Sequence, residues 1–129
     1  MQITALLHAS FLVADVTKAK MFYERTLGLM PSDARPDLGF PGVWYNIEPH
    51  QQLHLMQLPN PEIGLSRPTH GGSDRHVALG VASLGELIER LQQAGVPFTL
   101  SKSGRRALFC RDPDNNALEF IEWSNIPAP

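Results

Sequence analysis

The sequence predicts an α+β protein built from two similar modules, each with the element order β-α-β-β-β. In both halves a strand-like segment is followed by one amphipathic helical segment and then by further strand-like segments. The spacings also repeat, because Gly28 lies 20 positions after His8 and Gly95 lies 19 positions after His76. We therefore expect residues 1–129 to form a single domain. Its predicted parts are a first module at about residues 1–58, a linker at 59–74 and a second module at about 75–123.

The first module begins with a strand-like segment at residues 3–13, and Asp15 then occupies an N-cap position. Apolar residues recur after it at helical spacing, and Gly28 is placed to end that helix. Three extended segments are predicted beyond it, beginning at Leu29, Gly42 and Gln52.

The second module has stronger local signals. A strand-like segment, "RHVALGVA", precedes Ser83 and Glu86, which form a capping box at the start of a helix. Leu84, Leu87, Ile88, Leu91 and Ala94 form the predicted buried stripe of this helix, and Gly95 is a natural C-cap. The segments "VPFTL", "RRALFC" and "NALEFIEW" predict three more strands, of which the last two are joined by the turn-forming sequence "RDPDNN".

Composition excludes several classes of partner. The chain has a formal net charge of -2 and a pI of about 6.2, which gives no electrostatic reason to expect nucleic acid or an anionic membrane. The single Cys110 cannot form an internal disulfide, and the N-terminus lacks the pattern of a signal peptide. We therefore expect a cytoplasmic protein that binds a small molecule.

Four residues are predicted to project from the sheet faces that the helices do not cover. Alternation along the strands places apolar residues on one face and His8, His54, His76 and Glu119 on the other. A lone strand histidine is more often a structural residue than a ligand. Four such residues at matching positions of a repeat instead indicate a site for one divalent metal ion: Ni, Zn, Co, Fe or Mn.

The chain resembles the vicinal oxygen chelate superfamily, which includes glyoxalase I, extradiol dioxygenases, fosfomycin-resistance thiol transferases and bleomycin resistance proteins. The resemblance lies in "LLHASFLVADVTKAKMFYERTLGL", "DRHVALGV" and "FCRDPDNNALEFIEW". It implies that the two modules form curled mixed sheets around a metal-binding cleft. By position, His8, His76 and Glu119 resemble the metal triad of the family, and His54 matches an additional ligand of glyoxalase I. The resemblance also implies a homodimer.

The leading functional hypothesis is a metal-dependent, glyoxalase-like lyase or isomerase. It would act on a small oxygenated substrate through an enolate or alkoxide that the metal stabilises. Glu119 would transfer the proton, with His54 as the alternative catalytic residue. Other members of the superfamily offer alternatives: an extradiol dioxygenase-like enzyme, a fosfomycin-type thiol transferase, or a non-catalytic antibiotic-binding protein. Leu12 stands where bacterial glyoxalase I has a basic residue, and Phe109 stands near the position of the dioxygenase tyrosine.

Several other residues carry weaker signals. His50 and His70 lie in predicted loops and are expected to be solvated. Cys110 is expected to be a small core residue. Three arginines could hold an anionic substrate, although a charged strand edge explains them as well; they are Arg105, Arg106 and Arg111.

Overall fold

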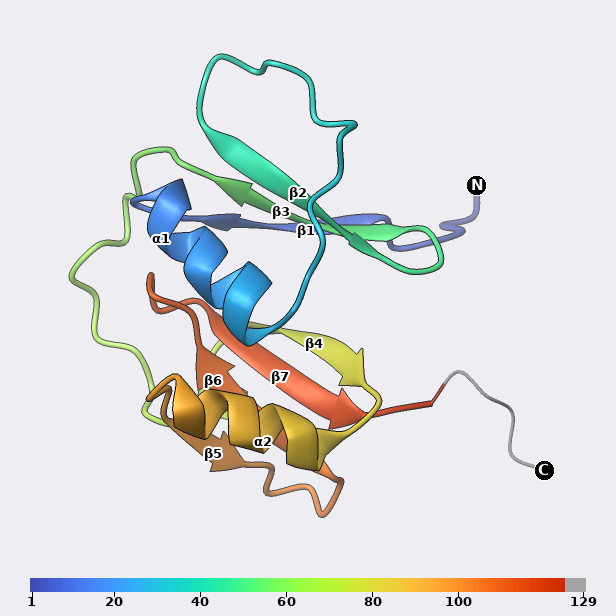
Figure 1. The fold of residues 1–129 in the computed structure, drawn as a ribbon, viewed down its shortest axis with the longest axis vertical. Helices are drawn as coiled ribbons and strands as arrows, with labels where there is room; N and C mark the ends of the chain where they lie inside the picture. The colour runs from blue at the N-terminus through green and yellow to red at the C-terminus, as the bar shows by residue number, and fades with distance from the viewer. Residues whose placement is uncertain (125–129) are drawn as a thin grey trace. The chain divides into compact units, whose positions relative to one another are not determined.

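Two mixed β-sheets are the main feature of residues 1–124, the part of the chain that this computed structural model describes (Figure 1). The α+β class predicted from the sequence is confirmed. The chain divides into two units, Met1–Ile63 and Gly64–Pro129, and the boundary falls within the predicted linker. The last residues of the predicted domain, 125–129, lie outside the described part.

The first unit has a three-stranded sheet with the order β1-β3-β2, in which β1 is parallel and β2 antiparallel to β3. Its elements are β1 (His8–Leu12), α1 (Val16–Lys20), the π-helix η1 (Met21–Thr26), β2 (Gly42–Ile47) and β3 (Gln51–Met56). The prediction of a strand over residues 3–13 was too long. The strand expected at Leu29 is reduced to a single bridge between Pro31 and Tyr45. Two backbone hydrogen bonds flank this bridge, from the Ser32 N–H to the Trp44 carbonyl at 2.7 Å and from the Asn46 N–H to the Met30 carbonyl at 3.2 Å.

The first helix begins as predicted from the sequence. The Asp15 carboxylate accepts hydrogen bonds from the backbone N–H groups of Thr17 and Lys18, at 2.9 and 3.3 Å. Beyond Lys20 the helix continues as η1, a wider π-helical turn that the sequence pattern did not indicate. Gly28 follows it with φ of 77°, a conformation that glycine adopts without a steric cost.

The second unit has the complete β-α-β-β-β order and a four-stranded sheet arranged β4-β7-β6-β5. Strand β4 is parallel to β7, and the other neighbours are antiparallel. Its elements are the 3-10 helix η2 (Gly71–Ser73), β4 (His76–Val81), α2 (Leu84–Gln93), β5 (Phe98–Leu100), β6 (Ala107–Arg111) and β7 (Ala117–Glu122). Both units thus pair their first strand in parallel with their last.

Helix α2 lies across one face of its sheet (Figure 1) and packs against β7. Ser83 caps its N-terminus by accepting a hydrogen bond from the N–H of Glu86 at 3.1 Å, which confirms the predicted cap. Gly95 ends it with φ of 70°. Ala94 is exposed, so the predicted buried stripe extends only as far as Leu91.

A tight turn joins β6 to β7 and so sets the start of the strand that carries Glu119. The Asp112 carboxylate, which is 5% exposed, accepts hydrogen bonds from the N–H groups of Asp114 and Asn116 and from the Asn116 side chain, at 2.8–2.9 Å. Asn115 adopts φ of 68°, in the left-handed region that asparagine tolerates. The predicted turn "RDPDNN" is therefore held by the first of its two aspartates.

In the first unit, the helix covers the apolar face of the sheet. The buried rings of Tyr23 and Tyr45 stack at 5.8 Å, and the Tyr45 hydroxyl donates to Glu24 at 2.9 Å. Burial and the adjacent Glu24 carboxylate raise the pKa of Tyr45 well above its ordinary value. By strand alternation, His8 and His54 therefore lie on the other face.

In the second unit, the apolar side of α2 packs on the sheet face that carries Leu118 and Phe120. Strand alternation places Glu119 on the opposite face. Within residues 1–124, no helix is both long enough and apolar enough to cross a bilayer.

Candidate functional site

A stack of three rings lies on the uncovered sheet face of the first unit. The His54 ring lies between those of Trp44 and His8, at centroid distances of 4.3 and 4.1 Å and interplanar angles of 7° and 13°. Trp44 and His54 are direct cross-strand partners, which brings their side chains to the same place on the sheet. The stack leaves His54 only 9% exposed.

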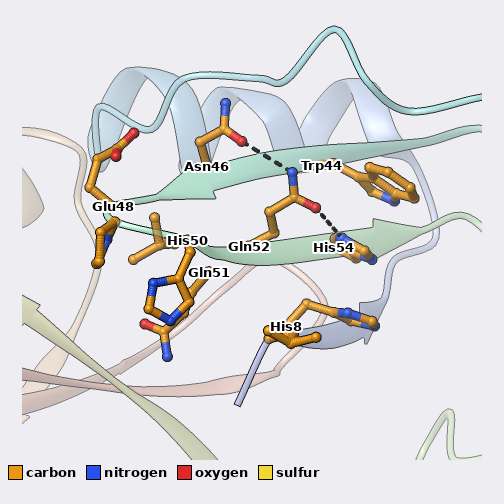
Figure 2. A pocket seen from close by; sticks show the side chains of 11 residues that line it. His8, Trp44, Asn46, Glu48, His50, Gln51, Gln52 and His54 are labelled. Carbon is orange, nitrogen blue, oxygen red and sulfur yellow. Dashed lines mark hydrogen bonds between the residues drawn. The ribbon is translucent and has the colours of Figure 1, made fainter. Parts of the chain in front are cut away.

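Two amide side chains continue from this stack along the same face. His54 Nε2 lies 2.9 Å from Gln52 Oε1, and Gln52 Nε2 donates to Asn46 Oδ1 at 3.1 Å (Figure 2). Burial, with smaller effects from His8 and Arg35, lowers the pKa of His54 below the ordinary imidazole value. Near neutral pH the ring is therefore uncharged and keeps one nitrogen lone pair for a metal ion or a proton.

A pocket of about 590 Å³ adjoins the stack, a size typical of sites for small ligands. Its floor and sides combine apolar groups with amides, imidazoles and a carboxylate. Figure 2 shows the polar side chains and Trp44 around it. The lining residues are Leu7, His8, Trp44, Asn46, Ile47, Glu48, Pro49, His50, Gln51, Gln52 and His54.

The second unit brings His76 and Glu119 together. His76 Nε2 lies 3.4 Å from Glu119 Oε1, and Glu119 is only 4% exposed. His76 Nδ1 lies 2.8 Å from the backbone carbonyl of Asp74, which can only accept, so Nδ1 carries a proton. In the neutral ring, a lone pair on Nε2 then faces a carboxylate oxygen. Two acceptors in this arrangement require a cation between them, either a proton or a metal ion.

Arg105 contacts the second carboxylate oxygen of Glu119. Its Nη2 atom lies 3.5 Å from Glu119 Oε2, while its side chain remains 60% exposed. The other two arginines that the sequence indicated hold the fold instead. Arg106 makes two hydrogen bonds to Glu122, and Arg111 binds Asp74 at 2.9 Å. Arg105 alone of the three therefore reaches the candidate site. Its position in the β5–β6 loop could not be read from strand spacing.

Phe109 connects two histidines of the second unit. Its ring makes edge contacts with His76 at 5.1 Å and with His70 at 4.8 Å. His70 is half-buried and its Nδ1 lies 2.8 Å from the hydroxyl of Thr99, so the expectation that it is solvated was wrong. His50 is exposed as expected, although it lines the pocket of the first unit.

The sequence did not single out Gln52 or Asn46. The available signal was alternation: residues 44 and 46 on one strand and 52 and 54 on the next share a face once the register is known.

Cys110 is buried as expected, and burial raises the pKa of its thiol to about 12. Its thiol is therefore not a nucleophile at neutral pH.

The structure thus places the four predicted ligands in two pairs, His8 with His54 in the first unit and His76 with Glu119 in the second. In the described part of the chain, no group of three or more histidine, cysteine, aspartate or glutamate side chains forms a metal-binding cluster. A common four-ligand site stays a prediction.

Comparisons with known proteins agree on one family. Residues 5–120 match the model of the Glyoxalase/Bleomycin resistance protein/Dioxygenase superfamily. The lactoylglutathione lyases of Salmonella typhimurium and Haemophilus influenzae are 27% and 26% identical, over 91% of this chain and 91% of the Salmonella enzyme.

Two solved structures share the fold at lower identity. The fosfomycin resistance protein FosX from Listeria monocytogenes has a TM-score of 0.74 at 18% identity, covering 96% of this chain and 94% of FosX. TnmS3, an antibiotic binding protein from a Streptomyces species, has a TM-score of 0.72 at 24% identity, covering 96% of this chain and 99% of TnmS3.

Proposed function

The chain belongs to the Glyoxalase/Bleomycin resistance protein/Dioxygenase superfamily, and from this premise we propose that it is a metal-dependent, glyoxalase-like enzyme. Its reaction is of the lyase or isomerase type, on a small oxygenated substrate. The observation that carries the proposal is the close approach of His76 Nε2 to Glu119 Oε1, at 3.4 Å. The lactoylglutathione lyase relatives support the reaction class.

The four predicted ligands fit a divalent metal by their chemistry. His8, His54, His76 and Glu119 would supply three imidazole nitrogens and one carboxylate, a normal ligand set for Ni, Zn, Co, Fe or Mn. Two of these imidazoles already have one nitrogen engaged, His54 by Gln52 and His76 by the Asp74 carbonyl. Such outer partners typically orient a metal-binding histidine. When bound, the metal supplies Lewis-acid stabilisation of the negative charge that develops on a substrate oxygen.

The remaining chemistry belongs to the side chains themselves. The carboxylate of Glu119 is the proposed proton acceptor, because either of its oxygens can take a proton from a substrate carbon or hydroxyl. His54 is the alternative, through the ring nitrogen that does not contact Gln52. The pocket beside Trp44 and His54 provides the space for a small substrate, and its amides and apolar groups would orient it.

A second candidate function is binding without turnover. The fold likeness to the antibiotic binding protein TnmS3 and the stacked rings beside the pocket are compatible with a planar ligand that is simply held. Affinity alone does not separate the two functions, because both require a ligand in the pocket. Turnover does separate them.

The first test measures metal content. Protein produced without an affinity tag or chelator is expected to contain about one divalent metal ion per chain. Elemental analysis should show that replacing both His76 and Glu119 by alanine removes it. His50→Ala is the matched control, because His50 lines the pocket but is outside the predicted ligand set. Metal content that survives the double replacement would refute the site.

Turnover is then tested on the metal-loaded protein with thiol adducts of 2-oxoaldehydes, catechols and fosfomycin. Product from the first class supports the glyoxalase-like proposal. Product from catechols or fosfomycin supports the dioxygenase-like or thiol-transferase alternative. Tight binding of a ligand with no product in any assay supports the binding protein.

We also propose that the two units form one domain and that the chain is a cytoplasmic homodimer. Strand β1 is an outer strand of its sheet, and the apolar Leu6 and Leu7 before it are 71% and 61% exposed. An outer strand beside exposed apolar groups favours pairing with another chain. Light scattering at micromolar concentration is expected to give twice the mass of the chain, and a strictly monomeric mass would exclude the dimer.

The cytoplasmic location is supported by the single, unpaired Cys110.

A further inference from the structure

We propose that Gln52, oriented by Asn46, is a positioning residue that fixes His54 in one tautomer, so that His54 presents Nδ1 and not Nε2 to its ligand. The orientation of the ring is a property of the chain by itself. The identity of the ligand, a metal ion or a substrate proton, rests on the proposed function.

The hydrogen-bond chain runs from His54 through Gln52 to Asn46. Asn46 and Gln52 are direct cross-strand partners on β2 and β3, and Gln52 Nε2 donates to Asn46 Oδ1 at 3.1 Å. The Gln52 amide oxygen therefore points the other way, and it lies 2.9 Å from His54 Nε2 (Figure 2). An amide oxygen only accepts, so Nε2 must carry the proton. The lone pair of the neutral ring is then on Nδ1.

The ring stack and the amide fix different degrees of freedom. Trp44 and His8 lie on the two faces of the His54 ring and so fix its plane. A rotation of the ring by 180° would preserve that plane, and stacking alone accepts both orientations. Only a directional contact at the ring edge distinguishes them, and the described contact is the one to Gln52. The contact with Gln52 therefore sets both the orientation and the tautomer of the His54 ring.

His76 presents the opposite nitrogen. Its Nδ1 donates to the backbone carbonyl of Asp74 at 2.8 Å, which leaves Nε2 toward Glu119. A backbone carbonyl cannot be removed by substitution, whereas the Gln52 amide can. A side-chain substitution can therefore change the tautomer of His54, whereas it cannot remove the group that sets the tautomer of His76.

The experiment uses full-length protein labelled with nitrogen-15 at histidine, free of metal. Two-bond proton–nitrogen correlations are recorded about two pH units above the ordinary imidazole pKa. His54→Asn identifies the signals of His54 by their loss. The wild-type protein is expected to show protonated Nε2 and unprotonated Nδ1. Gln52→Leu should give a mixture of both tautomers, whereas Gln52→Glu, whose carboxylate also accepts, should restore the single wild-type tautomer.

Two further variants make the result specific. Gln51→Leu is the matched control, because Gln51 also lines the pocket but donates to the Leu6 carbonyl instead. It should leave the His54 signals unchanged. Asn46→Ala removes the group that orients Gln52 and should also mix the tautomers. Asn46 is exposed, so this variant keeps the test available if Gln52→Leu does not fold.

Metal titration gives the second readout. The dissociation constant is expected to rise by ~10- to 100-fold in Gln52→Leu and to stay near the wild-type value in Gln52→Glu. A wild-type ring protonated at Nδ1, or a tautomer unchanged in both Gln52→Leu and Asn46→Ala, would overturn the inference. If the tautomers respond as expected but no variant, nor the wild type, binds metal, the positioning role stands and the proposed metal-dependent function fails.

Discussion

Glu119→Gln is expected to lower kcat by at least ~100-fold, within the usual range for loss of a general base, while much of the metal remains bound. Glutamine preserves the size of the side chain and one oxygen donor, but it cannot accept the substrate proton. It also suits the surroundings of Glu119. The amide oxygen can accept from Arg105, and the amide N–H can donate to His76 Nε2. The fold is therefore expected to survive the change.

The measurements are metal occupancy and kcat on the substrate that the turnover screen identifies. His54→Gln provides the contrast: we expect weaker metal binding, with a smaller loss of kcat once metal is resupplied. Glu122→Gln is the matched control, because Glu122 pairs with Arg106 and the N-terminus of α2 on the opposite face. It should retain near wild-type kcat. Normal turnover by fully metallated Glu119→Gln would mean that Glu119 is only a ligand.

The features that could be predicted from the sequence are those set by neighbouring residues. Asp15 and Ser83 cap their helices because an N-cap depends on groups two or three positions away. Alternation along single strands correctly separated His54 from Leu53 and Glu119 from Leu118, because each strand is regular. The choice of His8, His54, His76 and Glu119 as ligands stays a prediction.

Features that depend on contacts between strands were not predicted. The stack on His54 and its bond to Gln52 depend on the register that pairs Trp44 with His54, which no local pattern determines. For the same reason, the burial of His54 was not anticipated. Arg105 and His70 lie outside the strands, and the path of their segments depends on tertiary contacts such as that between His70 and Thr99. The strand predicted at Leu29 is only a single bridge at Pro31, because its pairing with β2 depends on contacts between distant segments.

Leu118→Ala is expected to lower the free energy of unfolding by about 3 kcal/mol, a typical cost for removing a fully buried leucine side chain. Leu118 has no exposed surface, and it lies between Val77 on β4 and Cys110 on β6. Urea denaturation of the metal-free protein measures the change. Leu100→Ala is the control, because Leu100 is 62% exposed and its loss should cost less than ~0.5 kcal/mol.

The same variant tests whether one face of β7 contributes to stability and the other to metal binding and turnover. The Leu118 side chain lies on the face covered by α2, and that of its neighbour Glu119 lies on the face with His76. Well below its melting temperature, Leu118→Ala should therefore bind metal and turn over substrate nearly as the wild type does, although it is less stable. Glu119→Gln should instead lose turnover while it keeps its fold and much of its metal. Loss of activity by fully folded Leu118→Ala would contradict this expectation. It would mean that the cavity left by the Leu118 side chain distorts β7 and displaces Glu119 on the opposite face of the strand.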